Sequence, residues 1–148
     1  MHLKELLGGT ERRTRVLDDC CQLIDEEVKS KGGFSGIAIK ASYAVVKGVK
    51  PTFLRESFDH LLDSFADHLN PVFQEAKQAG QPLEAFFATH QGRVADALLA
   101  ITDERATKAK SAVVLKAYNG LRGKAKENVE AAATRLGALV EKYDHEAP

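Results

Sequence analysis

Apolar residues recur at helical spacing near the start of the chain. After Thr10, which can cap a helix beginning at Glu11, one face carries Val16, Cys20, Leu23, Ile24 and Val28. The sequence Lys31-Gly32-Gly33 interrupts this spacing. The pattern therefore predicts a first helix that ends at these glycines.

The next predicted helix is short and strongly apolar. Ser35 can cap it, the residues from Ile37 to Val46 are mostly apolar, and Gly48 with Pro51 closes it. Pro51 also suits the start of a third helix. The apolar stripe of that third helix is Leu54, Phe58, Leu61 and Phe65.

Proline and glycine divide the rest of the chain. Asn70-Pro71 and Gly80 frame a brief fourth helix, and no proline follows Pro82 until Pro148. The second half is therefore predicted to be helical, with breaks near Asn119-Gly120 and Gly123. No segment alternates apolar and polar residues for long enough to predict a strand. The predicted fold class is all-α, a helical bundle in a single domain over residues 1–148.

The second half of the chain matches the first half. One group of matches aligns Arg15, Val16, Asp18, Asp25 and Glu26 with Arg93, Val94, Asp96, Asp103 and Glu104. A second group aligns Ser35, Lys40, Ala41, Tyr43 and Gly48 with Ser111, Lys116, Ala117, Tyr118 and Gly123. These matches predict that residues 88–146 repeat residues 11–70 and that residues 71–87 connect the two copies. The molecule would then hold two three-helix units related by a pseudo-twofold axis. The alternative is that two amphipathic helical segments agree by chance.

Charge is unevenly distributed although the formal net charge is zero. The segments 28–55 and 105–126 contain no acidic residue. A neutral total therefore does not argue against an anionic partner. The candidate residues for such a surface are Lys47, Lys50, Arg122 and Lys124. The alternative is that these side chains line the solvated edge of packed helices.

Lys40 interrupts the apolar second helix, as Lys116 does in the second copy. A lysine held in a pocket would have a lowered pKa and could act as a base or form a Schiff base. We favour structural ion pairs instead, because lysine stems commonly pack while the ammonium group reaches water or a carboxylate. The expected partners are Asp25 and Glu26 for Lys40, and Asp103 and Glu104 for Lys116.

The sequence offers no catalytic, cofactor-binding or metal-binding motif. Cys20 and Cys21 are adjacent, but there is no Cys-x-x-Cys and no His at ligand spacing nearby, so both are expected to pack as small apolar residues. The glycines of Lys31–Gly36 do not form a Walker loop or a dinucleotide fingerprint. We therefore expect no cofactor and favour a protein that is not an enzyme.

The run from Phe34 to Pro51, followed by Phe58-Asp59-His60-Leu61-Leu62, resembles a family of small bacterial all-helical proteins of unknown function. The resemblance covers about residues 13–71 and depends on the Ser-Gly, Lys, Tyr, Val-Lys and Pro positions. It implies a bacterial cytosolic helical protein. It assigns no catalytic residue.

Three classes of function are consistent with the sequence. The first is a non-enzymatic interaction or scaffold module that binds a protein partner or a second copy of itself. The second is a binder of nucleic acid or of an anionic phospholipid surface through 28–55 and 105–126. The third is a carrier of a small apolar ligand, or an enzyme that uses Lys40. The longest apolar stretch, Phe34 to Val46, is much shorter than the ~20 residues that span a bilayer. We therefore expect a cytoplasmic protein without a transmembrane segment.

Overall fold

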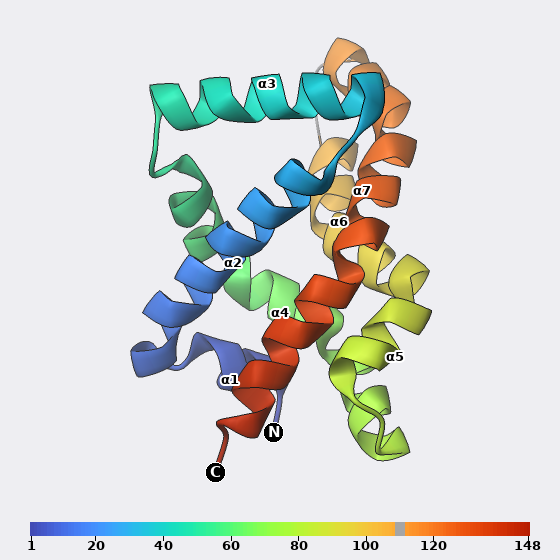
Figure 1. Ribbon diagram of the computed structural model, residues 1–148. Helices are drawn as coiled ribbons and strands as arrows, with labels where there is room; N and C mark the ends of the chain where they lie inside the picture. Colours follow the sequence, from blue (N-terminus) through green and yellow to red (C-terminus); the bar gives the residue numbers. More distant parts are fainter. Residues whose placement is uncertain (109–111) are drawn as a thin grey trace.

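The fold is all-α, as the sequence predicts. The computed structural model describes residues 1–108 and 112–148, without the side chains at positions 34, 113, 114, 117, 118 and 121. Within these residues there are helices and no strands (Figure 1). The helices are α1 (Leu3–Gly8), α2 (Thr10–Ser30), α3 (Gly33–Val49), α4 (Phe53–Ala79), α5 (Leu83–Thr89), α6 (Gln91–Thr107) and α7 (Ala112–His145).

The hydrophobic core lies toward the end of the molecule that carries both termini (Figure 1). The largest fully buried side chains include Leu3, Phe73, Phe87 and Tyr143, from α1, α4, α5 and α7. Helix α5 approaches α7 closely at Gly137, where a Cβ atom would lie 2.7 Å from the Leu83 carbonyl oxygen. We call this packed end of the molecule the base.

Helix α4 continues through Pro71, so the predicted separate helix from Pro71 to Gly80 is wrong. Proline leaves the carbonyl of the residue four positions earlier without its helical partner, at a cost of about 3 kcal/mol. Burial of Leu69, Val72 and Phe73 on both sides of Pro71 offsets that cost. The helix ends at Gly80, which adopts the left-handed conformation with φ of 64°.

Helix α7 runs without interruption through Gly120 and Gly123, where breaks were predicted. Glycine costs only about 1 kcal/mol relative to alanine inside a helix, so tertiary packing can override it. Helix α6 packs along α7, and the ion pair of Arg122 with Asp103 of α6 lies beside these glycines. Residues 88–146 therefore hold α6 and α7 in place of three helices, and the pseudo-twofold arrangement stays a prediction.

Helix α3 lies across the end of the molecule opposite the termini (Figure 1). A turn through Gly33, whose φ is 69°, reverses the chain after α2. Gly36 then allows α3 to approach the end of α2, because a Cβ atom there would lie 2.6 Å from the Lys31 carbonyl carbon. Helix α2 is the main neighbour of α3.

Candidate interaction surface

The two acid-free segments meet at one end of the molecule. Segment 28–55 contains α3, and the described part of 105–126 contains the end of α6 and the start of α7, which are drawn at the same upper end of Figure 1. Lys124 of α7 donates a hydrogen bond to Ser35 Oγ of α3 at 3.0 Å. Lys110, which belongs to the second segment, lies outside the described residues.

Helix α3 presents an apolar face to solvent. Ile37 is 66% exposed, Val45 is 64% exposed and Val49 is 82% exposed. Side chains advance by about 100° per residue in a helix, so these three lie within about a third of its circumference. The exposed Ala38 and Ala41 lie between them. We call Ile37, Ala38, Ala41, Val45 and Val49 the α3 face.

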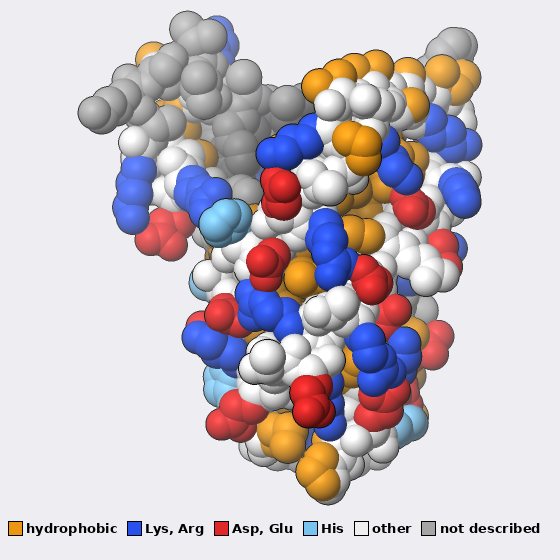
Figure 2. Space-filling model, turned by 90° about the vertical axis from the view of Figure 1, so that its left-hand side faces the viewer, with side chains coloured by type: hydrophobic (Ala, Val, Ile, Leu, Met, Phe, Trp, Pro, Cys, Tyr) orange, Lys and Arg blue, Asp and Glu red, His pale blue; other side chains and the backbone are white. Residues whose placement is uncertain are grey.

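This exposure is unusual because the exposed residues are large and adjoining. Single exposed apolar residues are normal on soluble proteins, whereas contiguous apolar patches mark interaction sites. Figure 2 shows hydrophobic side chains gathered along the upper edge of the molecule, above several Lys and Arg side chains. Phe53, at the start of α4, is also 47% exposed.

The opposite side of α3 is attached to α2 through Asp25. The Tyr43 hydroxyl donates a short hydrogen bond to Asp25 Oδ1, and Lys47 Nζ lies 3.1 Å from the same oxygen. The hydrogen bond from Tyr43 and the charge of Lys47 lower the pKa of Asp25, although burial opposes them. Burial, together with the contact to Asp25, raises the pKa of Tyr43. These contacts hold α3 so that the α3 face points away from α2.

The predicted ion pairs of Lys40 are wrong. Asp25 is paired with Lys47, and Glu26 Oε2 lies 3.6 Å from Arg135 Nε of α7. Lys40 is exposed and makes no ion pair with any described residue. The reason is position along the helix, because Lys40 and Lys47 lie on nearly the same side of α3 but two turns apart, and Lys47 is the one level with Asp25.

The corresponding prediction in the second half is wrong in the same way. Asp103 Oδ1 accepts from Arg122 Nε at 2.9 Å, and Glu104 Oε1 lies 3.2 Å from Lys108 Nζ. Lys116 is exposed and has no ion pair within the described part of the chain. In each half the first of the two acidic residues, Asp25 or Asp103, does pair with the following helix. Its basic partner, Lys47 or Arg122, lies beyond the predicted lysine.

Most of the basic residues chosen for an anionic-partner surface are already neutralised. Lys47 pairs with Asp25, Lys50 Nζ lies 2.8 Å from Glu56, and Arg122 pairs with Asp103. Lys124 is the member of that set with only a neutral partner, Ser35. The charge available to a partner therefore comes from other residues of the same segments.

Several Lys and Arg residues make no ion pair within the described chain. They are Arg12, Lys29, Lys40, Arg105, Lys116 and Lys124. Arg12 donates to the backbone carbonyls of Leu6 and Glu146 at the base. The other five lie in the two acid-free segments. We call Lys29, Lys40, Arg105 and Lys116 the free cations, because all four are exposed and none makes a hydrogen bond or ion pair with a described residue, although the charge of Lys29 helps to lower the pKa of Asp25.

The cysteines and acidic residues do not form a reactive or metal-binding centre in the described chain. Both thiols are free, and burial raises the pKa of Cys20 to about 12, so the thiolate is disfavoured at neutral pH. No group of three or more His, Cys, Asp or Glu residues among the described ones is arranged to hold a metal ion. Asp59 and Asp63, from the acidic stripe of α4, instead both contact Arg13, at 2.7 Å and 3.1 Å.

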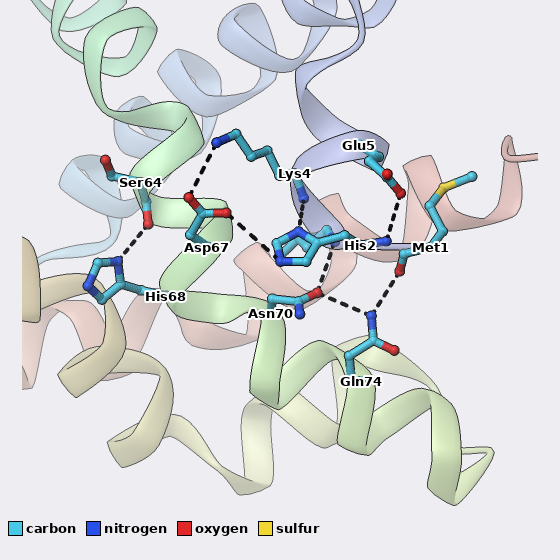
Figure 3. Close-up of polar contacts among 10 residues, drawn as sticks. Met1, His2, Lys4, Glu5, Ser64, Asp67, His68, Asn70 and Gln74 are labelled. Carbon is cyan, nitrogen blue, oxygen red and sulfur yellow. Dashed lines mark hydrogen bonds and ion pairs between the residues drawn. The ribbon is translucent and has the colours of Figure 1, made fainter.

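The base contains two sets of polar contacts that the sequence analysis did not predict. His2 caps α1 by accepting a hydrogen bond from the Lys4 amide, and Asn70 Oδ1 accepts from the Leu3 amide at 3.0 Å, as Figure 3 shows. On the other side, Asp19 of α2 accepts from Tyr143 and Lys142 of α7, at 2.6 Å and 2.7 Å. The His2 cap is local, whereas only the tertiary fold brings Asn70 to Leu3 and Asp19 to Tyr143. Both arrangements anchor helices to the core.

Comparison with known proteins identifies the family. Residues 3–144 match the model of a family of unknown function, DUF6918. The chain belongs to the DUF6918 family. No curated protein and no solved structure matches it. The resemblance to a helical family of unknown function is therefore confirmed, and DUF6918 membership assigns no activity to the α3 face. No described helix has the length and apolar character needed to cross a membrane.

Proposed function

We propose that this protein is a non-enzymatic interaction module and that it docks through the α3 face. The observation that carries the proposal is the exposure of Ile37, Val45 and Val49 on one side of a helix whose other side is fixed to α2. An apolar face of this kind loses its unfavourable contact with water when a partner covers it. Helix α3 is therefore the docking element, and the base is its scaffold.

The chemistry of the polar residues supports a non-catalytic role. Lys40 is solvent-exposed, so it lacks the desolvation that would activate it as a base or nucleophile. The hydroxyl groups of Tyr43 and Tyr143 are each hydrogen-bonded to an aspartate, and burial raises the pKa of both. These groups hold helices together.

The internal repeat fits this proposal as a scaffold built from one ancestral unit. The pair Lys47–Asp25 in α3 and α2 occupies the same aligned positions as Arg122–Asp103 in α7 and α6. The shared pair supports a duplication of 11–70 in 88–146. We also propose a cytoplasmic location.

The test removes the apolar character of the α3 face without touching the core. The double variant Ile37→Gln, Val45→Gln changes two exposed positions, so its helix content and thermal midpoint should match those of the wild type. The matched control is Ala85→Gln, Ala131→Gln, at exposed positions of α5 and α7 outside the α3 face.

Association is then measured in three ways: sedimentation velocity for self-association, vesicle co-sedimentation for lipid, and photo-cross-linking in cells from an exposed position beside Val45. We expect every association of the wild type to be lost in the α3-face variant and kept in the control. Associations that persist unchanged in the α3-face variant would refute the proposal.

A further inference from the structure

We propose that the partner of the α3 face is an anionic phospholipid surface, on which α3 lies flat with its apolar side chains inserted at the headgroup boundary. This inference depends on the proposed function above, because it names what the α3 face binds. It combines the exposed apolar face with the charges that surround it.

The charge around α3 is positive and available. The free cations Lys29, Lys40, Arg105 and Lys116 belong to α2, α3, α6 and α7, and these parts of the four helices lie at the same end of the molecule (Figure 1). The nearby acidic residues Asp25, Glu26 and Glu56 are each paired with a basic residue. These three carboxylates are therefore already paired and do not oppose the approach of an anionic surface.

Lys40 connects the two features on one helix. It lies one turn from Ile37 and from Ala44, so its ammonium group emerges at the margin of the α3 face. Lysine at the edge of an apolar face is typical of helices that lie in a membrane interface, where the stem follows the apolar boundary and the charge reaches a phosphate. The wide apolar arc from Ile37 to Val49 fits a planar surface in the same way.

The same charges disfavour a second copy as the occupant. If two α3 helices packed antiparallel about a twofold axis, the margin carrying Lys40 and Lys47 would face the same margin of the other copy. If they packed parallel, Lys40 would lie against the apolar margin of the other copy. Helix α3 contains no acidic residue that could compensate in either arrangement.

The distribution of the free cations disfavours a single acidic helix as the occupant. They come from parts of four different helices that lie at the same end of the molecule, whereas one docked helix would cover only the α3 face. An extended anionic surface is the occupant that can reach cations on more than one helix. Each basic residue near such a surface strengthens binding by about fivefold, since it contributes about 1 kcal/mol.

The experiment measures co-sedimentation of the full chain with vesicles of phosphatidylcholine alone and of phosphatidylcholine mixed with phosphatidylglycerol. We expect binding only to the mixed vesicles, weakening as salt shortens the screening length to about 10 Å at 0.1 M. Ile37→Gln, Val45→Gln should abolish it, and Lys40→Gln should weaken it about fivefold. Replacing all four free cations with Gln should remove most of the affinity. Lys4→Gln is the matched control, because it removes one lysine at the base.

The outcomes separate this inference from the proposed function. Absence of vesicle binding, together with self-association or protein cross-links that the α3-face variant abolishes, would overturn the lipid surface and keep α3 as the docking element. Vesicle binding that needs the free cations but not Ile37 and Val45 would overturn the insertion of α3. If every association of the wild type persists unchanged in the α3-face variant, both proposals are overturned.

Discussion

The base of the molecule and helix α3 are both rich in apolar residues, yet only the base buries them. Phe73, Phe87 and Tyr143 are 2%, 0% and 0% exposed in the base, whereas Ile37 and Val45 of α3 are 66% and 64% exposed. The difference arises because helices from both ends of the sequence converge on the base, while α3 has α2 as its main neighbour. An apolar helix is therefore a core element only where other helices reach it.

Truncating one apolar side chain in each region gives the largest contrast. Phe87→Ala should lower the free energy of unfolding by about 3–5 kcal/mol, because it leaves a cavity in a fully buried site. Ile37→Ala should change it by less than about 0.5 kcal/mol, since the side chain is mostly in water. Urea denaturation followed by circular dichroism measures both values. A large loss for Ile37→Ala would show that α3 is packed in solution.

The same contrast explains what the sequence could predict. Helical periodicity predicts α2, α3 and the all-α class, because these depend on local spacing and on glycine stops. It does not predict the continuity of α4 through Pro71, where burial at the base overrides the local signal, or of α7 through Gly123, where α7 contacts α6. Nor does it show that α3 is exposed, since a buried and an exposed apolar helix have the same composition.

For the candidate surface, the sequence likewise indicates local features but not the contacts between helices. The sequence alone identifies the two acid-free segments, and the structure brings them into contact through Lys124 and Ser35. The individual pairings failed, since the basic partners are Lys47 and Arg122, which lie about two turns further along their helices than Lys40 and Lys116. The neutralising acids Glu56 and Asp96 lie outside these segments, so their contacts with Lys50 and Arg122 depend on tertiary structure.

Adding a methyl group sharpens the comparison between packed and open positions of one helix. Gly137→Ala should destabilise the protein by about 1–3 kcal/mol, because its Cβ would lie 2.8 Å from Glu84 Cα. Gly123→Ala, also in α7, should stabilise it by up to about 1 kcal/mol, since no atom lies within 4 Å of the new Cβ. Thermal denaturation compares the two variants. Equal effects at both glycines would contradict the close contact of α5 with α7.

Low pH should weaken the contacts of α2 with the base and its contacts with α3 through two different aspartates, Asp19 and Asp25. Hydrogen bonds from Lys142 and Tyr143 lower the pKa of Asp19 despite the opposing effect of burial. A lowered folded-state pKa means that this stabilisation is complete above the unfolded pKa of about 3.9 and is lost as pH falls through the folded value. We expect the free energy of unfolding to fall below about pH 4, with a shallower slope for Asp19→Asn.

The pKa of Asp25 is lowered as well, mainly by the hydrogen bond from Tyr43. Its protonation should loosen α3 from α2 and leave the base folded. As the pH falls below about 4, hydrogen exchange should therefore rise in α3 earlier than in α7. Simultaneous loss of protection in both helices would show that α3 and the base unfold as one unit.

The smallest expected effect concerns the attachment of α3 itself. Tyr43→Phe removes the hydrogen bond to Asp25 but leaves Lys47 in place, so it should cost about 1 kcal/mol or less in global stability. Its main effect should be local. Hydrogen exchange in α3 should become faster, because the helix is held less firmly on α2. Lys40→Ala is the matched change on the same helix and should alter neither value, since Lys40 has no ion pair with the described residues. If the two variants exchange at the same rate in α3, the contact with Asp25 does not hold the docking helix in position.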